Sequence, residues 1–200
     1  MKKSLLVLIG VFVFLGLVVL IGFLTSISTY NKMVQYDEAV TTSWSQVENV
    51  YQRRADLIPN LVNTVKGYAD FEKETLTQVI EARAKATSVN ITAENLNEQT
   101  MAQFQQAQAG LSSALSKLMV VVEKYPDLKA NQNFLELQAQ LEGTENRIAN
   151  ERMKFNETTK IYNVYVRKFP ARFFASLYGF EQKPYFKAEA GAEKVPEVKF

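Results

Sequence analysis

The sequence of 200 residues contains neither cysteine nor histidine. Without cysteine the chain has no disulfide, no thiol chemistry and no lipoprotein-type anchor. Without histidine it has no zinc finger, imidazole-ligated metal, serine–histidine triad or histidine switch. An excess of one charge is also lacking, since Lys plus Arg number 23 and Asp plus Glu 21. Nucleic-acid binding asks for a basic face, so no nucleic-acid partner is expected.

One long hydrophobic run stands at the start of the chain. Residues 4–31 carry no charge, and residues 5–24 are apolar apart from three glycines. Twenty helical residues span roughly 30 Å, the thickness of the bilayer's hydrocarbon core. The run exceeds the roughly 7–15 apolar residues of a signal peptide, although the small residues 26–28 leave cleavage open. We therefore predict an uncleaved transmembrane anchor over residues 1–25.

The basic residues near this span predict its orientation. Lys2 and Lys3 precede the span, and Lys32 is the basic residue that follows closely. Basic residues near a span favour the cytoplasmic side. We therefore expect the N-terminus in the cytoplasm and the following domain on the outer, periplasmic side.

Residues 26–168 show a helical period almost throughout, with breaks at a few positions. The first helix is expected to leave the membrane and continue to about Asp56, because Pro59 disfavours a continuous helix and suits the first turn of a new one. The second helix is expected to fade near Ala84. Residues 85–92 are expected to form a loop, in which Asn90 or Thr92 would cap the third helix.

The third and fourth helices are marked by apolar residues at steps of seven. The third helix ends at Tyr125-Pro126, and the fourth is expected to run from about Asp127 to Lys168, before Pro170. The fourth helix carries Phe134, Leu141, Ile148, Phe155, Tyr162 and Phe169. A seven-residue step is typical of coiled-coil-like bundle packing. The fold class is therefore all-α: an N-terminal transmembrane helix continuing into an antiparallel four-helix bundle.

The predicted domain boundaries follow from these elements. The bundle would occupy residues 26–180 and include a short amphipathic piece at 171–180. Residues 181–200 read as a polar C-terminal tail, which we expect to be loosely ordered.

Several short motifs occur together in a fixed order. They are residues 53–62 (RRADLIPNLV), 65–68 (VKGY), 125–131 (YPDLKAN), 137–138 (LQ), 141–149 (LEGTENRIA) and 169–170 (FP). With the N-terminal span, they resemble the LemA family of bacterial single-pass membrane proteins over about residues 1–186. The chain has Phe71 where the family usually has histidine, and Phe155 where it usually has tyrosine. The missing histidine weighs against a metal or acid–base role at that position.

The resemblance implies an inner-membrane protein with one span and a helical bundle. It also implies a family without an established enzymatic activity. Some relatives are associated with membrane organisation, including invaginated organelle membranes. The resemblance therefore defines the fold more closely than the function.

Polar residues lie beside the apolar stripe of the fourth helix. They are Gln138, Glu142, Glu145, Asn146 and Arg152. We interpret them as a structural seam of inter-helix hydrogen bonds and ion pairs that fixes the bundle register. A carboxylate Mg²⁺ or Ca²⁺ site is the alternative, whereas the histidines of a di-iron bundle are absent. No catalytic residue, cofactor or metal ligand is expected.

A second polar group surrounds the expected turn between the first two helices. It consists of Arg53, Arg54, Asp56 and Asn60. Asp56 or Asn60 could cap a helix start, and the arginines could tie helix ends together. The alternative is a partner-binding tip at the end of the bundle farthest from the membrane.

The end of the fourth helix is rich in aromatic residues. Nine of the chain's 23 aromatic residues lie between Tyr162 and Phe186, with basic residues among them. Such a mixture is typical of membrane-interface segments, and a helix of about 60 Å would return to the bilayer. The predicted interface residues are Tyr165, Phe169, Arg172, Phe173, Phe174, Tyr178 and Phe180. Alternatively, these aromatics pack on the base of the bundle or on a neighbouring protomer.

These observations favour a membrane-anchored, non-enzymatic scaffold or adaptor that acts through protein–protein and membrane contacts. Its expected partners are the lipid bilayer, other membrane proteins and further copies of itself. A self-assembling, membrane-organising protein is the alternative, supported by the seven-residue repeat and the small residues Gly22 and Ser26. A carboxylate-metal enzyme is the least favoured class.

Overall fold

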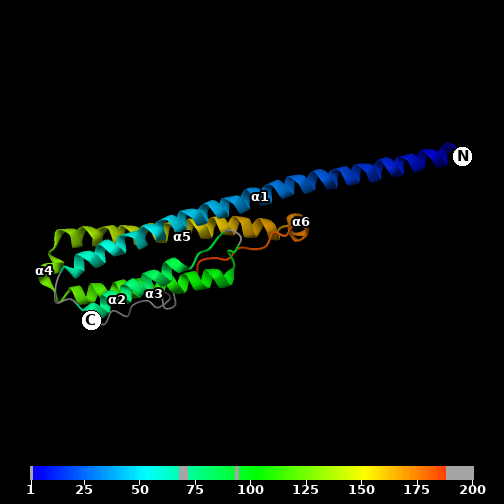
Figure 1. Ribbon diagram of the computed structural model, residues 1–200. Coiled ribbons are helices and arrows are strands. Elements are labelled where there is room, and N and C mark those ends of the chain that lie inside the picture. Colours follow the sequence, from blue (N-terminus) through cyan, green and yellow to red (C-terminus); the bar gives the residue numbers. More distant parts are fainter. Residues whose placement is uncertain (1, 68–71, 93–94, 188–200) are drawn as a thin grey trace, which may run out of the picture. The chain divides into compact units, whose positions relative to one another are not determined.

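The computed structural model describes residues 2–67, 72–92 and 95–187. All regular structure in this part of the chain is helical, which confirms the predicted all-α class (Figure 1). The helices are α1 (Lys2–Lys66), α2 (Lys73–Ser88), α3 (Glu98–Val122), α4 (Pro126–Lys129), α5 (Gln132–Arg167) and α6 (Ala171–Tyr178). They divide into two compact units, which we call the anchor unit (Met1–Val40 with Lys160–Gln182) and the bundle unit (Thr41–Thr159 with Lys183–Phe200).

The predicted four-helix bundle is found in the bundle unit. Its core combines apolar side chains from α1, α2, α3, α4 and the first part of α5. The core residues include Ile58, Leu61, Val65, Leu76, Val79, Leu111, Leu115, Leu118, Leu128, Phe134 and Leu141. Leu111, Leu118, Phe134 and Leu141 all come from the two seven-residue series, so the period does mark the buried face.

The expected break before Pro59 is wrong, because α1 runs without interruption to Lys66. A proline inside a helix removes the N–H that would bond to the carbonyl four residues earlier. That carbonyl belongs to Ala55, and the side-chain Nε of Arg83 on α2 donates to it at 2.7 Å. A side chain from the neighbouring helix thus donates to the carbonyl that Pro59 leaves unpaired. This bond compensates the helix for the lost main-chain hydrogen bond.

The third helix begins later than expected and with a different cap. Helix α2 extends to Ser88, and the N-cap of α3 is Asn97 rather than Asn90 or Thr92. The Asn97 side chain accepts from the Thr100 N–H, and the Thr100 hydroxyl accepts from the Asn97 N–H, which completes a capping box.

The fourth helix is divided near its start. The expected helix from Asp127 is interrupted after α4, and α5 begins at Gln132. The side chain of Asn131 accepts a hydrogen bond from the Phe134 N–H at 3.1 Å, which is the geometry of an N-cap. The asparagine therefore caps the start of α5, whereas Ala130 is the C-cap of α4. The predicted end of the long helix near Lys168 agrees with its observed end at Arg167.

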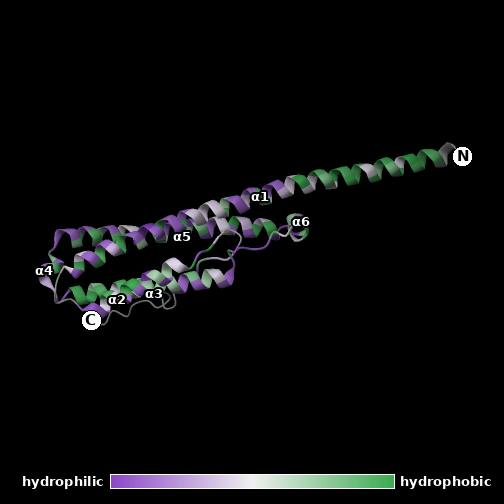
Figure 2. Ribbon diagram, in the orientation of Figure 1, coloured by the Kyte–Doolittle hydropathy of each residue, from purple (hydrophilic) through white to green (hydrophobic). Residues whose placement is uncertain are grey.

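The anchor unit contains the apolar start of α1, which is hydrophobic on all sides (Figure 2). Every large apolar side chain from Leu5 to Leu24 is at least 50 % exposed. This part of α1 is long and apolar enough to cross a membrane. Helix α6 belongs to the same unit and ends at Gly179, whose φ of 76° places it in the left-handed region that glycine readily adopts.

The chain after α6 differs from the loose tail that we expected. Residues 183–187 belong to the bundle unit, and Phe186 is only 6 % exposed. Aromatic side chains surround the Phe186 ring, so this one apolar residue packs into the bundle unit although the segment is polar overall. Residues 188–200, the remainder of the expected tail, lie outside the described residues.

Candidate functional sites

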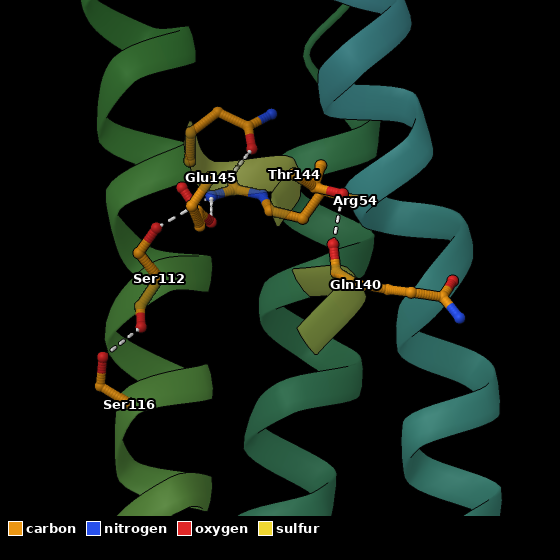
Figure 3. Close-up of polar contacts among 7 residues, drawn as sticks. Arg54, Ser112, Ser116, Gln140, Thr144 and Glu145 are labelled. Atoms are coloured by element: carbon orange, nitrogen blue, oxygen red, sulfur yellow. Dashed lines mark hydrogen bonds and ion pairs between the residues drawn. The ribbon is translucent and has the colours of Figure 1, made fainter. Parts of the chain in front are cut away.

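A buried arginine of the bundle unit makes polar contacts with side chains of other helices (Figure 3). Arg54 on α1 is 1 % exposed, although its charge would favour the surface. Its Nη1 donates to the Ser112 hydroxyl on α3 at 3.0 Å and to the Glu145 carboxylate on α5. Its Nη2 donates to the Gln108 side-chain oxygen on α3. The Arg54 charge is therefore paired and hydrogen-bonded, as a buried charge requires.

The network extends to α2 through Gln108. The amide of this buried side chain donates to the Ala86 carbonyl on α2 at 3.3 Å. Arg54 also lies over the ring of Tyr51, with 5.1 Å between the guanidinium carbon and the ring centroid. One connected set of contacts thus joins α1, α2, α3 and α5.

The space beside Arg54 is too small for a substrate. A cavity of about 50 Å³ is lined by residues that include Tyr51, Arg54, Glu145 and Arg152. Pockets for small molecules usually measure about 300–1,000 Å³, whereas this volume suits one or two waters. The Arg54 Nε is buried and has no hydrogen-bond partner among the residues that the structure describes. The geometry is that of a structural network.

The expected tip residues do not lie at a turn. Residues 53–60 are all inside α1, so neither Asp56 nor Asn60 caps a helix start there. Asp56 instead accepts from the Gln52 amide one turn earlier, at 2.8 Å. Arg54 is buried and offers no binding surface, whereas Arg53, Asp56 and Asn60 are exposed. A partner-binding role for these three exposed residues stays a prediction.

The residues of the expected polar seam have different roles. Glu145 makes the predicted contact between helices, and Arg152 donates to the Lys187 carbonyl at 3.1 Å. Gln138 and Glu142 bond to each other within α5, at 3.0 Å, and Asn146 is exposed. In the described ranges no group of three or more Asp, Glu, His or Cys side chains could hold a metal ion.

Sequence reasoning missed Gln108 and Ser112, the α3 partners of Arg54. Gln108 lies four residues after Phe104 and three before Leu111, so the helical period places it on the buried stripe. A polar residue on an apolar stripe is the signal that could have identified the network. The seven-residue spacing does not predict that Arg54 is the partner of Gln108 across the bundle.

The second candidate site is helix α6 in the anchor unit. Ala171 and Ala175 are buried on its inner face. Its outer face carries Phe173 and Leu177, which are 67 % and 65 % exposed, and Phe169 just before the helix is 92 % exposed. Phe173 and Leu177 are four residues apart and share one face of the helix, and Phe169 lines the same surface hollow; we call the surface of these three residues the outer face of α6. Arg167 and Arg172 flank it.

Contacts within the anchor unit place α6 beside the end of the apolar span. The Tyr178 hydroxyl and the Ser26 hydroxyl are 2.6 Å apart. The Tyr30 ring packs edge-on against Tyr178 and Phe180, with centroid distances of 5.1 and 5.8 Å. Because the apolar run ends at Leu24, α6 lies within about two helical turns of the end of the span.

Two tyrosines near the end of α5 have raised pKa values. Tyr165 packs on Tyr36 at 5.0 Å, and burial raises the pKa of its phenol. Burial, with the charges of Asp37 and Glu181, strongly raises the pKa of Tyr162, whose hydroxyl donates to the Glu181 carbonyl at 2.7 Å. Both phenols are therefore neutral hydrogen-bonding groups at physiological pH.

The predicted interface segment thus divides into two sets. Tyr165, Tyr178 and Phe180 make the aromatic contacts with α1, and Phe174 stacks on Tyr178. Phe169, Arg172 and Phe173 are exposed. Phe169 is the last member of the seven-residue series, and its exposure shows that the series does not mark a buried residue there. It lies beyond the end of α5, where the helical stripe no longer applies.

Known proteins share this sequence pattern. A family model described as LemA family matches residues 43–200. Magnetosome protein MamQ of Magnetospirillum gryphiswaldense is 28 % identical over 185 residues, which cover 84 % of this chain and 68 % of that protein. Magnetosome protein MamQ 2 of Paramagnetospirillum magneticum is 26 % identical over 186 residues, with the same shares covered. Protein LemA of Metamycoplasma hominis is 21 % identical over 133 residues, 66 % of this chain and 57 % of that protein. None of these names denotes an enzyme.

Proposed function

Because this chain belongs to the LemA family, we propose that it is a membrane-anchored, non-enzymatic scaffold or adaptor acting through protein–protein and membrane contacts. The family model covers residues 43–200, and the part of α1 before them is long and apolar enough to cross a membrane. The outer face of α6 carries the proposal, because an apolar surface beside the end of a span requires a lipid or protein neighbour.

The membrane part of this role is docking of α6 at the bilayer interface. Amphipathic helices bind there by inserting aromatic and aliphatic side chains while basic residues face the headgroups. Phe169, Phe173 and Leu177 supply the apolar side, and Arg167 and Arg172 the basic residues. Flotation of residues 27–200 with anionic liposomes tests this docking. Floating protein that sinks after replacement of the three apolar residues by serine supports it, whereas protein that stays at the bottom contradicts it.

Self-assembly that organises the membrane is the second candidate function. The observation that favours it is the similarity to proteins named for the magnetosome. The same outer face of α6 would then act as a wedge in the headgroup region, repeated in every copy. The expected location remains the bacterial inner membrane with the bundle on the periplasmic side.

Purification of the full-length protein in mild detergent distinguishes the two functions. A defined complex with a different membrane protein supports the adaptor role. A large complex of this chain alone supports the self-assembling role. A monomer without any co-purifying protein, at concentrations matching those in the membrane, contradicts both.

A further inference from the structure

The segment that follows α6 is held in the bundle unit as a bound peptide would be. The Phe186 ring stacks on Trp44, with centroids 5.9 Å apart and planes inclined by 21°. It meets Phe155 edge-on at 5.5 Å and Phe104 at 6.4 Å. Three helices, α1, α3 and α5, thus contribute one aromatic side chain each to a single pocket, which we call the Phe186 seat.

The seat also forms hydrogen bonds with the backbone of the segment. The Asn156 side chain accepts from the Phe186 N–H at 2.9 Å and donates to the Phe186 carbonyl at 3.1 Å. This pair of bonds uses the complete hydrogen-bonding capacity of one residue's main chain, in the way that a neighbouring strand would. Both bonds can form only where the backbone of the bound residue is extended. They do not depend on the identity of the next side chain in the segment.

Two further side chains hold the next residue. Gln105 on α3 and Arg152 on α5 both donate to the Lys187 carbonyl, at 3.0 and 3.1 Å. The Arg152 guanidinium also lies over the Phe186 ring at 4.9 Å. The seat therefore combines an aromatic pocket with donors aimed at an extended main chain, which are the two requirements for recognising a peptide.

The helix residues that form the seat also contact one another and the bundle backbone. The Trp44 indole donates to the Ile91 carbonyl at 3.1 Å, which fixes the ring. Trp44 also meets Phe104 and Phe155 at 5.4 and 5.5 Å, independently of Phe186. Only short stretches of irregular backbone connect the segment to α6, beginning at Gly179.

We propose that the Phe186 seat is a peptide-binding site that residues 183–187 of a second copy of this chain can occupy in place of the chain's own segment. The matching ligand is present in every copy, and a common membrane concentrates the copies. Exchange of an identical segment forms an interface without any new complementary surface, since the seat already fits it. The proposal concerns the bundle unit and does not depend on the membrane docking of α6.

The absence of native cysteine allows a direct test of exchange. Two single-cysteine variants of the full-length protein, Gln105→Cys and Lys187→Cys, carry different tags and are expressed together in one membrane. A short bismaleimide should link the two tags. The control replaces Lys187→Cys by Lys117→Cys, whose position on α3 lies outside the seat. The double variant in one chain shows that the pair can react in cis.

Linkage of Gln105→Cys to Lys187→Cys at several times the control level supports exchange. Linkage at the control level, when the double variant reacts efficiently in cis, overturns it. A complex with a foreign adaptor partner would not produce this pattern, so failure of exchange and failure of the adaptor role are separable.

The chain's single tryptophan gives a second test on the same seat. A peptide with the sequence of residues 181–187 is added to the full-length Phe186→Ala variant, in which the aromatic ligand is removed. Saturable change in Trp44 fluorescence is expected, with affinity at least about tenfold weaker for a peptide carrying alanine in place of Phe186. No change, or equal change with both peptides, contradicts a peptide-binding seat.

Discussion

Phe155 within the long helix α5 and Phe169 just beyond its end show that one sequence period can lead to opposite environments. Phe155 in the bundle unit is fully buried, whereas Phe169, fourteen residues later in the same seven-residue series, is 92 % exposed. Both are phenylalanine at the same position of the repeat. The difference arises because residues near Phe155 are covered by other helices and Phe169 lies beyond the end of α5. A period defines a face, and the neighbours decide whether that face is buried.

The two units also differ in the kinds of residue that they bury and expose. The bundle unit buries an arginine and supplies it with Ser112, Gln108 and Glu145. The anchor unit exposes a run of large apolar residues and the outer face of α6. A buried charge with its own partners indicates a self-contained unit. Exposed apolar surface indicates that the other unit is completed by a second apolar phase, which we propose is the membrane.

The largest predicted effect comes from the two phenylalanines. Phe155→Ala should lower the free energy of unfolding by about 3–5 kcal/mol, because it leaves a cavity at a fully buried site. Phe169→Ala should change it by less than about 0.5 kcal/mol. Urea denaturation followed by circular dichroism in mild detergent measures both. Equal losses in the two variants would remove the distinction between the units.

The next effect concerns the buried charge. Glu145→Ala should cost about 3 kcal/mol, because it leaves the Arg54 guanidinium buried without its counter-charge. Glu142→Ala is the matched control one turn away, where the Gln138 bond within α5 is exposed, and should cost about 0.5 kcal/mol. Thermal unfolding of both variants measures the difference. A Glu145→Ala variant as stable as the control would show that Arg54 does not rely on this partner.

A smaller effect is expected where Arg83 supports the helix at Pro59. Arg83→Ala should cost about 1–3 kcal/mol, because it leaves the buried Ala55 carbonyl without a donor. In a Pro59→Ala background the cost should fall, since the restored N–H of residue 59 can bond to the same carbonyl. A double-mutant cycle by urea denaturation measures this coupling. Additive losses would show that Arg83 does not compensate for the proline.

The smallest effect depends on pH. Burial raises the pKa of Glu48 above its usual value of 4.5, so the folded protein holds this proton more firmly than the unfolded chain. Stability from this group is complete below the usual pKa and falls as the pH rises through the raised value. Glu48→Gln should therefore raise the Tm by about 1 °C at pH 7 and leave it unchanged at pH 4. Scanning calorimetry at the two pH values compares the variant with the parent, and an equal shift at both would contradict the assignment.

The sequence predicted the helical class, the apolar N-terminal helix, the bundle and most buried positions of α5, because these follow from hydrophobic periodicity and from one unbroken hydrophobic run. It predicted a break at Pro59 because a local rule was applied without knowledge of Arg83, which lies 28 residues away from the carbonyl that it satisfies. The cap at Asn97 was missed for a different reason, since several asparagines and threonines near it have similar propensity.

The candidate sites were less predictable than the fold. Arg54 and Glu145 were both named, but their pairing requires knowing which helices face each other across the bundle. The aromatic segment at 165–186 was recognised from composition, which does not separate residues that pack on α1 from those that stay exposed. Asn156 and Phe186 are 30 residues apart, so no local sequence pattern predicts the two hydrogen bonds between them.

The most direct test of the central claim measures the depth of α6 in a bilayer. Spin labels at Phe173→Cys and, as a control, at the exposed α5 residue Met153→Cys report collision with oxygen and with a water-soluble nickel complex in nanodiscs. If α6 docks at the bilayer interface, the label on α6 meets mainly oxygen and the control label mainly nickel. Equal, high accessibility to nickel at both positions would place α6 in water and contradict membrane docking.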